Sequence, residues 1–328
     1  MKTSETASAN HCIHCGACTN RCLFLKKYGM DLSGFAKRAD LSRNCFLCGD
    51  CGRICPAGID GVQIALQSRK REGNGRDQTS RLMSAERILL REKSPYLFRN
   101  HRHGKTGTVF FPGCNFTGFY PRTTGKLMKL LRDAGIGTVF DCCAKPLFEL
   151  GRADEAKRNL LAMEKSLRRQ GVTELLLACP NCYYFLKDRS TFRCTMIYEK
   201  LPELTNIRTI KRDVFHVYTP CPDRDTEEVL SLVKSFLDGE IRFSYQDVQC
   251  CGSGGCASVR EPELAKQMRR IAAAKEMRMT TYCATCAGTF QRGGVGDVEH
   301  ILPVLLGTNE TPPANPLVSL LNRAIRRL

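Results

Sequence analysis

The chain has 328 residues and carries 50 Lys and Arg against 33 Asp and Glu, a formal net charge of +17. At about 100–200 residues per domain, this length predicts two or three domains with real cores. No apolar run approaches the roughly 20 residues that span a bilayer, and the first residues lack the apolar stretch of a secretory signal. We therefore expect neither a transmembrane nor a secreted protein, but a cytoplasmic one.

Twenty cysteines are the most unusual feature of the composition. In a reducing compartment ten disulfides are not expected, and spaced cysteines more often bind metal. Eight of them lie between Cys12 and Cys55, and the other twelve lie between Cys114 and Cys286. The chain is therefore expected to contain two distinct cysteine-rich regions.

The first region contains the spacing Cys-x2-Cys-x2-Cys-x3-Cys twice, and Pro56 follows the second copy. In this spacing three neighbouring thiolates hold one [4Fe–4S] cluster, and the fourth reaches the other cluster. Two four-cysteine zinc sites are the alternative, but zinc loops rarely repeat this pattern. We assign one cubane cluster to Cys12, Cys15, Cys18 and Cys55, and the second to Cys45, Cys48, Cys51 and Cys22.

Between and after these motifs the residues favour helices. Ile59, Val62, Leu66 and Arg69 follow the second motif at helical spacing. The segment resembles the α-helical ferredoxin domain found in succinate dehydrogenase iron–sulfur subunits and in the C subunit of heterodisulfide reductase. The compact β-type ferredoxin is the weaker match.

A basic connector separates the two regions. Residues 69–105 carry eleven Lys or Arg and four Asp or Glu, which is +7 of the net charge. A turn is predicted at residues 73–75 and a helix from Ser80 to about Arg91. No aromatic interleaving accompanies the basic residues, so we expect a solvated face rather than nucleic-acid binding. An acidic face of a redox partner is expected to meet its first basic residues, Arg69, Lys70 and Arg71.

From about residue 107, strand and helix patterns alternate, which predicts α/β layers around a mostly parallel sheet. The strand candidates are 109–111, 139–140, 175–178 and 214–218. The helix candidates are 127–131, 153–167, 226–237 and 262–277.

The cysteines of this second region form an internal repeat, with offsets of 107, 108 and 104 residues between matching positions. A repeated domain is the natural interpretation. Most of these cysteines follow a strand candidate, and the carboxyl ends of parallel strands are where α/β folds bind ligands. The first set is Cys114, Cys142, Cys143, Cys179 and Cys182, and the second is Cys221, Cys250, Cys251, Cys283 and Cys286.

Several local sequences carry a resemblance: Phe-Pro-Gly-Cys114, Cys142-Cys143-Ala-Lys-Pro, Cys179-Pro-Asn-Cys182 and Cys250-Cys251-Gly-Ser-Gly-Gly. They resemble the cysteine-rich CCG domain family. That family includes the B and D subunits of heterodisulfide reductase, the C subunit of glycerol-3-phosphate dehydrogenase, and glycolate oxidase iron–sulfur subunits. With the ferredoxin-like part in front, residues 10–290 resemble the D subunit of heterodisulfide reductase, a fusion of C-like and B-like parts.

The resemblance implies that each complete five-cysteine set holds a non-cubane [4Fe–4S] cluster, and that a disulfide is cleaved between the two clusters. Ala144 follows the first cysteine pair where the family often has Gly, and Tyr218 stands where the second repeat commonly has His. These departures concern the identity of the substrate. One or two zinc sites with buried free cysteines are the alternative. Cys194 and Cys256 have no counterpart in the repeat; we expect a core thiol and a residue that lines the site.

The predicted architecture is an α-helical dicluster ferredoxin domain followed by two repeated Rossmann-like α/β domains. The boundaries are 1–72 for the ferredoxin domain, 73–106 for the connector, 107–210 and 211–310 for the CCG domains, and 311–328 for an amphipathic helix. In that helix Leu317, Leu321, Ala324 and Leu328 share one face. We expect this face to pack on the protein's own core, with docking on a partner or a membrane as the alternative.

The leading functional hypothesis is a heterodisulfide-reductase-like enzyme, in which electrons enter at the two cubanes and leave through the non-cubane pair to a disulfide or a related sulfur substrate. The clusters carry the chemistry, and no acid–base residue is nominated. The alternative is an electron-transfer subunit of a flavin-dependent 2-hydroxyacid or glycerol-3-phosphate dehydrogenase. Expected partners are a flavoprotein, a membrane cytochrome b subunit, or both, which would place the chain at the inner face of the membrane.

Overall fold

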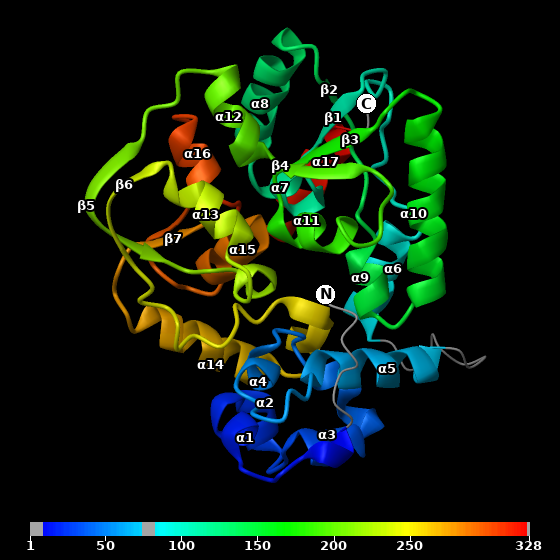
Figure 1. The fold of residues 1–328 in the computed structure, drawn as a ribbon, viewed down its shortest axis with the longest axis vertical. Helices are drawn as coiled ribbons and strands as arrows, with labels where there is room; N and C mark the ends of the chain where they lie inside the picture. The colour runs from blue at the N-terminus through cyan, green and yellow to red at the C-terminus, as the bar shows by residue number, and fades with distance from the viewer. Residues whose placement is uncertain (1–8, 74–82, 327–328) are drawn as a thin grey trace.

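The computed structural model describes residues 9–73 and 83–326 and contains three regions (Figure 1). An N-terminal helical region lies beneath two α/β units, which stand side by side. One continuous apolar core joins all three regions, from Phe24 to Leu306. The turn expected at 73–75 and the start of the helix expected from Ser80 fall largely outside the described residues.

The N-terminal region is built from short helices, and residues 9–73 contain no strand. Phe24, Leu25, Leu32 and Phe35 form its buried interior. Its elements are η1 (Ala9–His11), α1 (Ala17–Arg21), α2 (Leu23–Lys27), α3 (Leu32–Ala36), η2 (Ala39–Asn44), α4 (Asp50–Arg53) and α5 (Gly61–Gly73). This is the helical character that the sequence predicts, while the ferredoxin assignment stays a prediction.

The first α/β unit contains a parallel four-stranded sheet in the order β2-β1-β3-β4. Val109, Phe110, Leu175 and Leu176 are fully buried, as both faces of such a sheet are covered by helices. Its elements are β1 (Thr108–Phe111), α7 (Cys114–Phe119), α8 (Pro121–Asp133), β2 (Gly137–Thr138), α9 (Lys145–Glu149), α10 (Ala153–Arg168), β3 (Glu174–Leu177), α11 (Pro180–Leu186), β4 (Arg193–Met196) and α12 (Ile197–Leu204).

The second unit repeats this topology, with a parallel sheet in the order β6-β5-β7-β8. Its elements are β5 (Ile210–Val217), η3 (Cys221–Asp223), α13 (Glu228–Lys234), β6 (Leu237–Arg242), η4 (Gly254–Val259), α14 (Pro262–Ala273), β7 (Met279–Thr281), α15 (Ala284–Arg292), β8 (Val298–His300) and α16 (Ile301–Leu305). The matching strand orders confirm the prediction of two repeated, parallel α/β units.

Several predicted boundaries are wrong by a few residues. β2 ends just before the strand expected at 139–140. Val139 still donates to the Phe110 carbonyl of β1, and Phe140 exchanges two backbone hydrogen bonds with Asn100. The helix expected at 226–237 is shorter, because Leu237 already begins β6. β4, β6, β7 and β8 have no counterpart among the predicted strands. β4 and β6 carry polar, exposed residues, and β7 and β8 are only three residues long.

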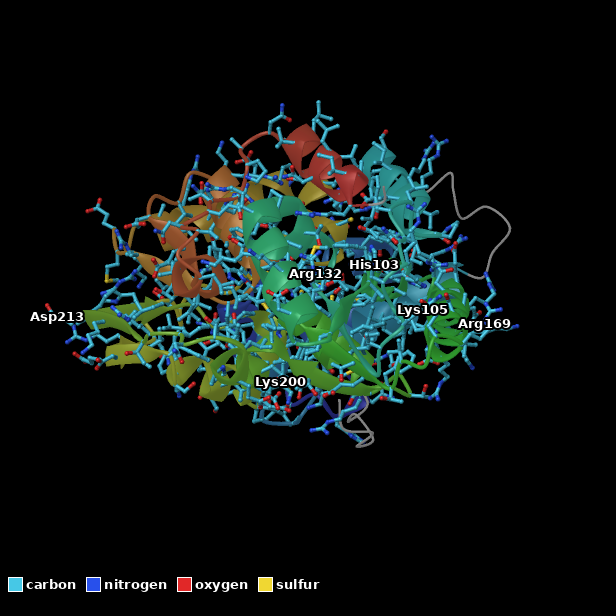
Figure 2. All side chains as sticks on the ribbon, turned by 90° about the horizontal axis from the view of Figure 1, so that it is seen from above. His103, Lys105, Arg132, Arg169, Lys200 and Asp213 are labelled. Carbon is cyan, nitrogen blue, oxygen red and sulfur yellow. The ribbon has the colours of Figure 1, made fainter. Side chains whose placement is uncertain are left out.

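The basic connector is in part the solvated face that its composition predicts: Arg87, Arg91, Arg102 and Lys105 are exposed, whereas Lys93 is buried. Its helix α6 (Ser84–Lys93) buries Glu86 and Lys93 against the rest of the protein. Arg260 pairs with Glu86 at 2.9 Å, so α6 is fastened to the second unit. At the C-terminal end of the connector, the carbonyl of His103 lies against Gly137 at the start of β2. His103 and Lys105 therefore lie at the end of the molecule remote from α1–α5 (Figure 2).

Arg69 also contradicts the expectation of an exposed docking residue. Its side chain is completely buried where the three regions meet. Its guanidinium donates to the carbonyl oxygens of Ser42, Cys45, Glu149 and Gly255. Lys70 and Arg71 are exposed, so they alone of the three residues retain the accessibility that docking needs.

The C-terminal helix α17 (Pro316–Ile325) returns to the first unit and packs against α7, but with its polar face. Asn322 donates to the Gly118 carbonyl, Arg323 pairs with Glu92, and Arg326 donates to the Pro121 carbonyl. The expected packing of its apolar face is wrong: this face is exposed, and Leu317, Leu321 and Ile325 keep 65%, 60% and 63% of their surface. Leu328 lies outside the described residues.

The inverted packing of α17 predicts an unusual stability pattern. Leu321→Ser is expected to change the free energy of unfolding by less than about 0.5 kcal/mol, because the side chain is already in solvent. Asn322→Leu is expected to cost about 1 kcal/mol, because it leaves the Gly118 carbonyl without its donor. Denaturant titration of both variants measures the difference. A larger loss for Leu321→Ser would show that the apolar face is covered.

Candidate functional site

Two cavities in the N-terminal region are each walled by four cysteines. The first also touches Asp31 and Leu32. The second also touches Phe24, Phe46 and Gln249. The first cavity brings together Cys12, Cys15, Cys18 and Cys55, and the second brings together Cys22, Cys45, Cys48 and Cys51. Each group is one of the two predicted ligand sets. Cys55 of the second motif lies with the first group, and Cys22 of the first motif lies with the second, as predicted.

The two cysteine loops have the same backbone path. His14 in the first loop and Leu47 in the second both have φ of 54°, and a left-handed glycine follows each two residues later. The loops differ in their surroundings. Cys15 is exposed, whereas Cys48 and Cys51 are buried. The first cavity is therefore the outer one, and the second lies toward the α/β units. We call them the outer and inner sites.

A histidine lies at the edge of the outer site. His14 Nδ1 lies 2.6 Å from Asp31 Oδ2, and Cys12 Sγ donates to the same carboxylate oxygen at 3.7 Å. The Gly34 backbone N–H, together with His14, holds the pKa of Asp31 below its usual range. His14 thus reaches the site through Asp31, and its ring is largely exposed.

The five cysteines of the first α/β set form one connected group at the carboxyl end of the sheet. Hydrogen bonds with Cys142 and Cys182 lower the pKa of Cys143 to about 5. Cys114 hydrogen-bonds to Cys142, and Cys179 to Cys182. The structure therefore gathers the five thiols in the order Cys114–Cys142–Cys143–Cys182–Cys179.

The second set repeats this arrangement residue for residue. Cys250 hydrogen-bonds to Cys221 and Cys251, and Cys286 hydrogen-bonds to Cys251 and Cys283. The hydroxyl of Tyr218 is fully buried and has no hydrogen-bond partner among the described residues. Burial raises the pKa of this phenol well above its usual range, and neighbouring Cys221, Cys286 and Cys251 add to the effect.

These donor sets fit iron–sulfur clusters. Four thiols around one cavity match the ligation of a cubane, and five connected thiols exceed the needs of one tetrahedral zinc ion. The unpaired Tyr218 hydroxyl lies near Cys221, Cys251 and Cys286 of the second set, where a bound sulfide or thiolate would accept its hydrogen bond. The chemistry of the residues therefore agrees with the predicted cofactors at all four sites.

The two five-cysteine sets face each other across the boundary between the α/β units. Asn181 Nδ2 of the first set donates to Cys283 Sγ of the second at 3.4 Å, and Asn115 donates to Thr285 at 2.8 Å. Lys145 lies near both sets: burial lowers its pKa, but Glu149, Cys143 and Cys221 together raise it above the usual range. The side chain is partly exposed, so this boundary is accessible from solvent.

The second set also touches the inner site. Hydrogen bonding with Cys250 lowers the pKa of Cys48 to about 6. Gln249 donates to Cys22 Sγ and Cys48 Sγ at 3.4 and 3.5 Å. In the glycine-rich loop that follows, a Cβ on Gly254 would lie 2.0 Å from the Phe46 carbonyl. The loop therefore allows the second unit to approach the helical region closely.

The sequence patterns do not single out Gln249 or Lys145 as site residues. They assign Arg69 to partner docking, and Tyr218 only to the identity of the substrate. The repeat offers one signal: Gln249 and Asp141 both precede the cysteine pair, 108 residues apart, and both are buried. Cys194 lies in β4, and its thiol donates to the Phe192 carbonyl. Cys256 lies near Arg69 and Glu149. Neither belongs to one of the four cysteine groups.

Comparison with known proteins identifies the repeated unit. The family described as the cysteine-rich CCG domain matches residues 108–187 and again residues 215–291. These ranges contain both five-cysteine sets. The chain therefore carries two CCG cysteine-rich domains, as the sequence predicts.

Three relatives illustrate the wider similarity. An uncharacterised iron–sulfur protein of Methanocaldococcus jannaschii is 24% identical over 74% of this chain and 55% of its own length. The B subunit of fumarate reductase (CoM/CoB) of Methanothermobacter marburgensis is 22% identical over 92% of this chain and 72% of its own. The D subunit of dihydromethanophenazine:CoB–CoM heterodisulfide reductase of Methanosarcina barkeri is 24% identical over 68% of this chain and 64% of its own.

The chain thus spans 55% of the M. jannaschii relative, so the activity of that whole protein does not transfer to it directly. Among the described residues, no helix combines the length and the apolar character that crossing a bilayer requires.

Proposed function

We propose that this chain, with its two CCG domains, is an iron–sulfur oxidoreductase subunit related to heterodisulfide reductase. The observation that carries the proposal is the presence of two complete five-cysteine sets with the same arrangement. They lie next to each other, because Asn181, between Cys179 and Cys182 of the first set, donates to Cys283 of the second. An electron-transfer module needs clusters in sequence, but it does not need two complete sets that face one another.

In this proposal the cysteines of the N-terminal region hold two cubane clusters and each CCG set holds a non-cubane cluster. Bound iron–sulfur clusters supply one-electron transfer. A disulfide needs two electrons and two protons to become two thiols, and the electrons come from a flavoprotein donor. Lys145, between Cys143 and Cys221, provides a positive charge beside the position at which the thiolates form.

The relatives whose names give a function are subunits of reductases, which favours partner subunits for this chain as well. We propose a flavoprotein, a membrane cytochrome b subunit, or both as its partners, with any contact to a membrane made through them. The exposed Lys70 and Arg71 follow Arg69, which donates to the Cys45 carbonyl, and they suit an acidic donor face because complementary charge raises the rate of encounter.

The decisive test is reduction of small-molecule disulfides by the anaerobically purified protein with a low-potential artificial donor. Turnover that depends on both CCG sets supports the reductase. If the protein carries its clusters and reduces a quinone or a partner protein but no disulfide, it is instead an electron-transfer subunit of a flavin-dependent dehydrogenase.

Iron content provides a separate prediction. Four clusters of the [4Fe–4S] type imply about sixteen irons and sixteen sulfides per chain. Cys194→Ser and Cys256→Ser are expected to keep that content, because neither residue lies in a cysteine group. Quantitative iron and sulfide analysis measures all three proteins. A content of about eight irons per chain together with zinc would contradict the proposed clusters in the CCG domains.

A further inference from the structure

The carboxamide of Gln249 lies between the inner site and the second CCG set. Its Nε2 donates to Cys22 Sγ at 3.4 Å and to Cys48 Sγ at 3.5 Å. Its Oε1 accepts the backbone N–H of Leu23 at 2.8 Å. Because this N–H requires an acceptor, the amide oxygen must point to Leu23 and the NH₂ group to the sulfurs. The side chain is buried, so its orientation is fixed on both sides.

The backbone of Gln249 is fixed as firmly as its side chain. Arg224 donates to the carbonyls of Gln249 at 3.0 Å and Val248 at 3.1 Å. The same guanidinium lies 3.5 Å from Asp50, which adjoins Cys51 of the inner site. The loop that carries Gln249 and Cys250 is therefore held against the N-terminal region by hydrogen bonds to its main chain.

The corresponding residue of the first CCG domain has a different environment. Asp141 pairs with Arg99 and His101, both at the end of the connector. It also accepts the N–H of Cys142. The residue before the cysteine pair therefore fixes the cysteine loop in both repeats, but in the second repeat it also donates to sulfurs of the inner site.

We propose that Gln249 is a positioning residue that raises the reduction potential of the inner cluster and couples that cluster to the second CCG site. The inference rests on the proposed function, because it assumes a cluster held by Cys22, Cys45, Cys48 and Cys51. Hydrogen bonds to ligand sulfurs stabilise the more negative, reduced state and so raise the potential. Through Cys250, the next residue, the second CCG set receives each electron first, and the first set follows.

Gln249→Leu and Gln249→Glu test the proposal together. Leucine removes both amide contacts, whereas glutamate keeps the acceptor for Leu23 and replaces the donor to the sulfurs with a carboxylate. Both variants are expected to lower the midpoint potential of the inner cluster by about 59 mV, a tenfold shift in a one-electron equilibrium. Potentiometric titration followed by EPR measures it without turnover. The matched control is Gln246→Leu, an exposed residue three positions earlier, which should leave the potential unchanged.

The outcomes separate this inference from the proposed function. If the wild-type protein lacks an inner cubane signal, the proposed function fails. If the signal is present and both Gln249 variants keep the wild-type potential, only the role of Gln249 is overturned. Loss of the inner cluster in both variants would show a purely structural role and would overturn it too. A second supporting readout is slower reduction of the CCG clusters in freeze-quench experiments, while the outer cluster is reduced at the wild-type rate.

Discussion

Replacing Arg69 with leucine is expected to destabilise the protein by roughly 3–5 kcal/mol. The variant leaves the carbonyls of Ser42, Cys45, Glu149 and Gly255 without the donor that they share, in a fully buried position. Burial lowers the pKa of Arg69, which shows how completely the group is removed from water. Chemical denaturation under anaerobic conditions measures the loss, and iron content is expected to fall with it.

Arg71→Leu is the matched control, because this neighbour lies on the same helix and is exposed. It should change the free energy of unfolding by less than about 0.5 kcal/mol. Lys70→Glu with Arg71→Glu then tests docking of an acidic donor without disturbing the interior. A stability loss for Arg71→Leu as large as that for Arg69→Leu would contradict the burial of Arg69.

Replacing one cysteine in a CCG set and one at the inner site is expected to show which cysteines hold which cluster. Cys251→Ser should lose about four of sixteen irons and abolish disulfide reduction, yet keep both cubane EPR signals. The reason is that Cys251 hydrogen-bonds within its own set, to Cys250 and Cys286. Cys48→Ser should lose the inner cubane signal and block electron entry from the donor.

Iron analysis, EPR and disulfide turnover on the same preparations check these outcomes, with Cys194→Ser as the control that keeps all iron. The contact of Cys48 with Cys250 adds a refinement: Cys48→Ser should also shift the spectrum of the second CCG cluster. Loss of a cubane signal in Cys251→Ser would mean that the CCG and N-terminal cysteines do not form separate sites.

The sequence alone determined how the eight N-terminal cysteines divide into two groups, because thiol spacing in a tight loop is a local property. The crossing of Cys22 and Cys55 between the N-terminal groups follows from the motif, and the cavities contain them. The two parallel sheets were equally predictable, since cysteine offsets and strand–helix alternation both repeat. Short strands with polar outer residues, such as β4 and β6, gave too weak a pattern to be found.

The tertiary structure decided how the sites connect and which charges are buried. Arg69 is one of many basic residues in the sequence, but the carbonyls that bind it come from three separate regions of the chain. Gln249 depends in the same way on sulfurs more than 200 positions earlier. In α17 the spacing of Leu317 and Leu321 reveals an apolar face but not its direction. Hydrogen bonds from Asn322 to α7 and from Arg326 to α8 hold the polar face of α17 against the first unit, which leaves the leucines pointing outward.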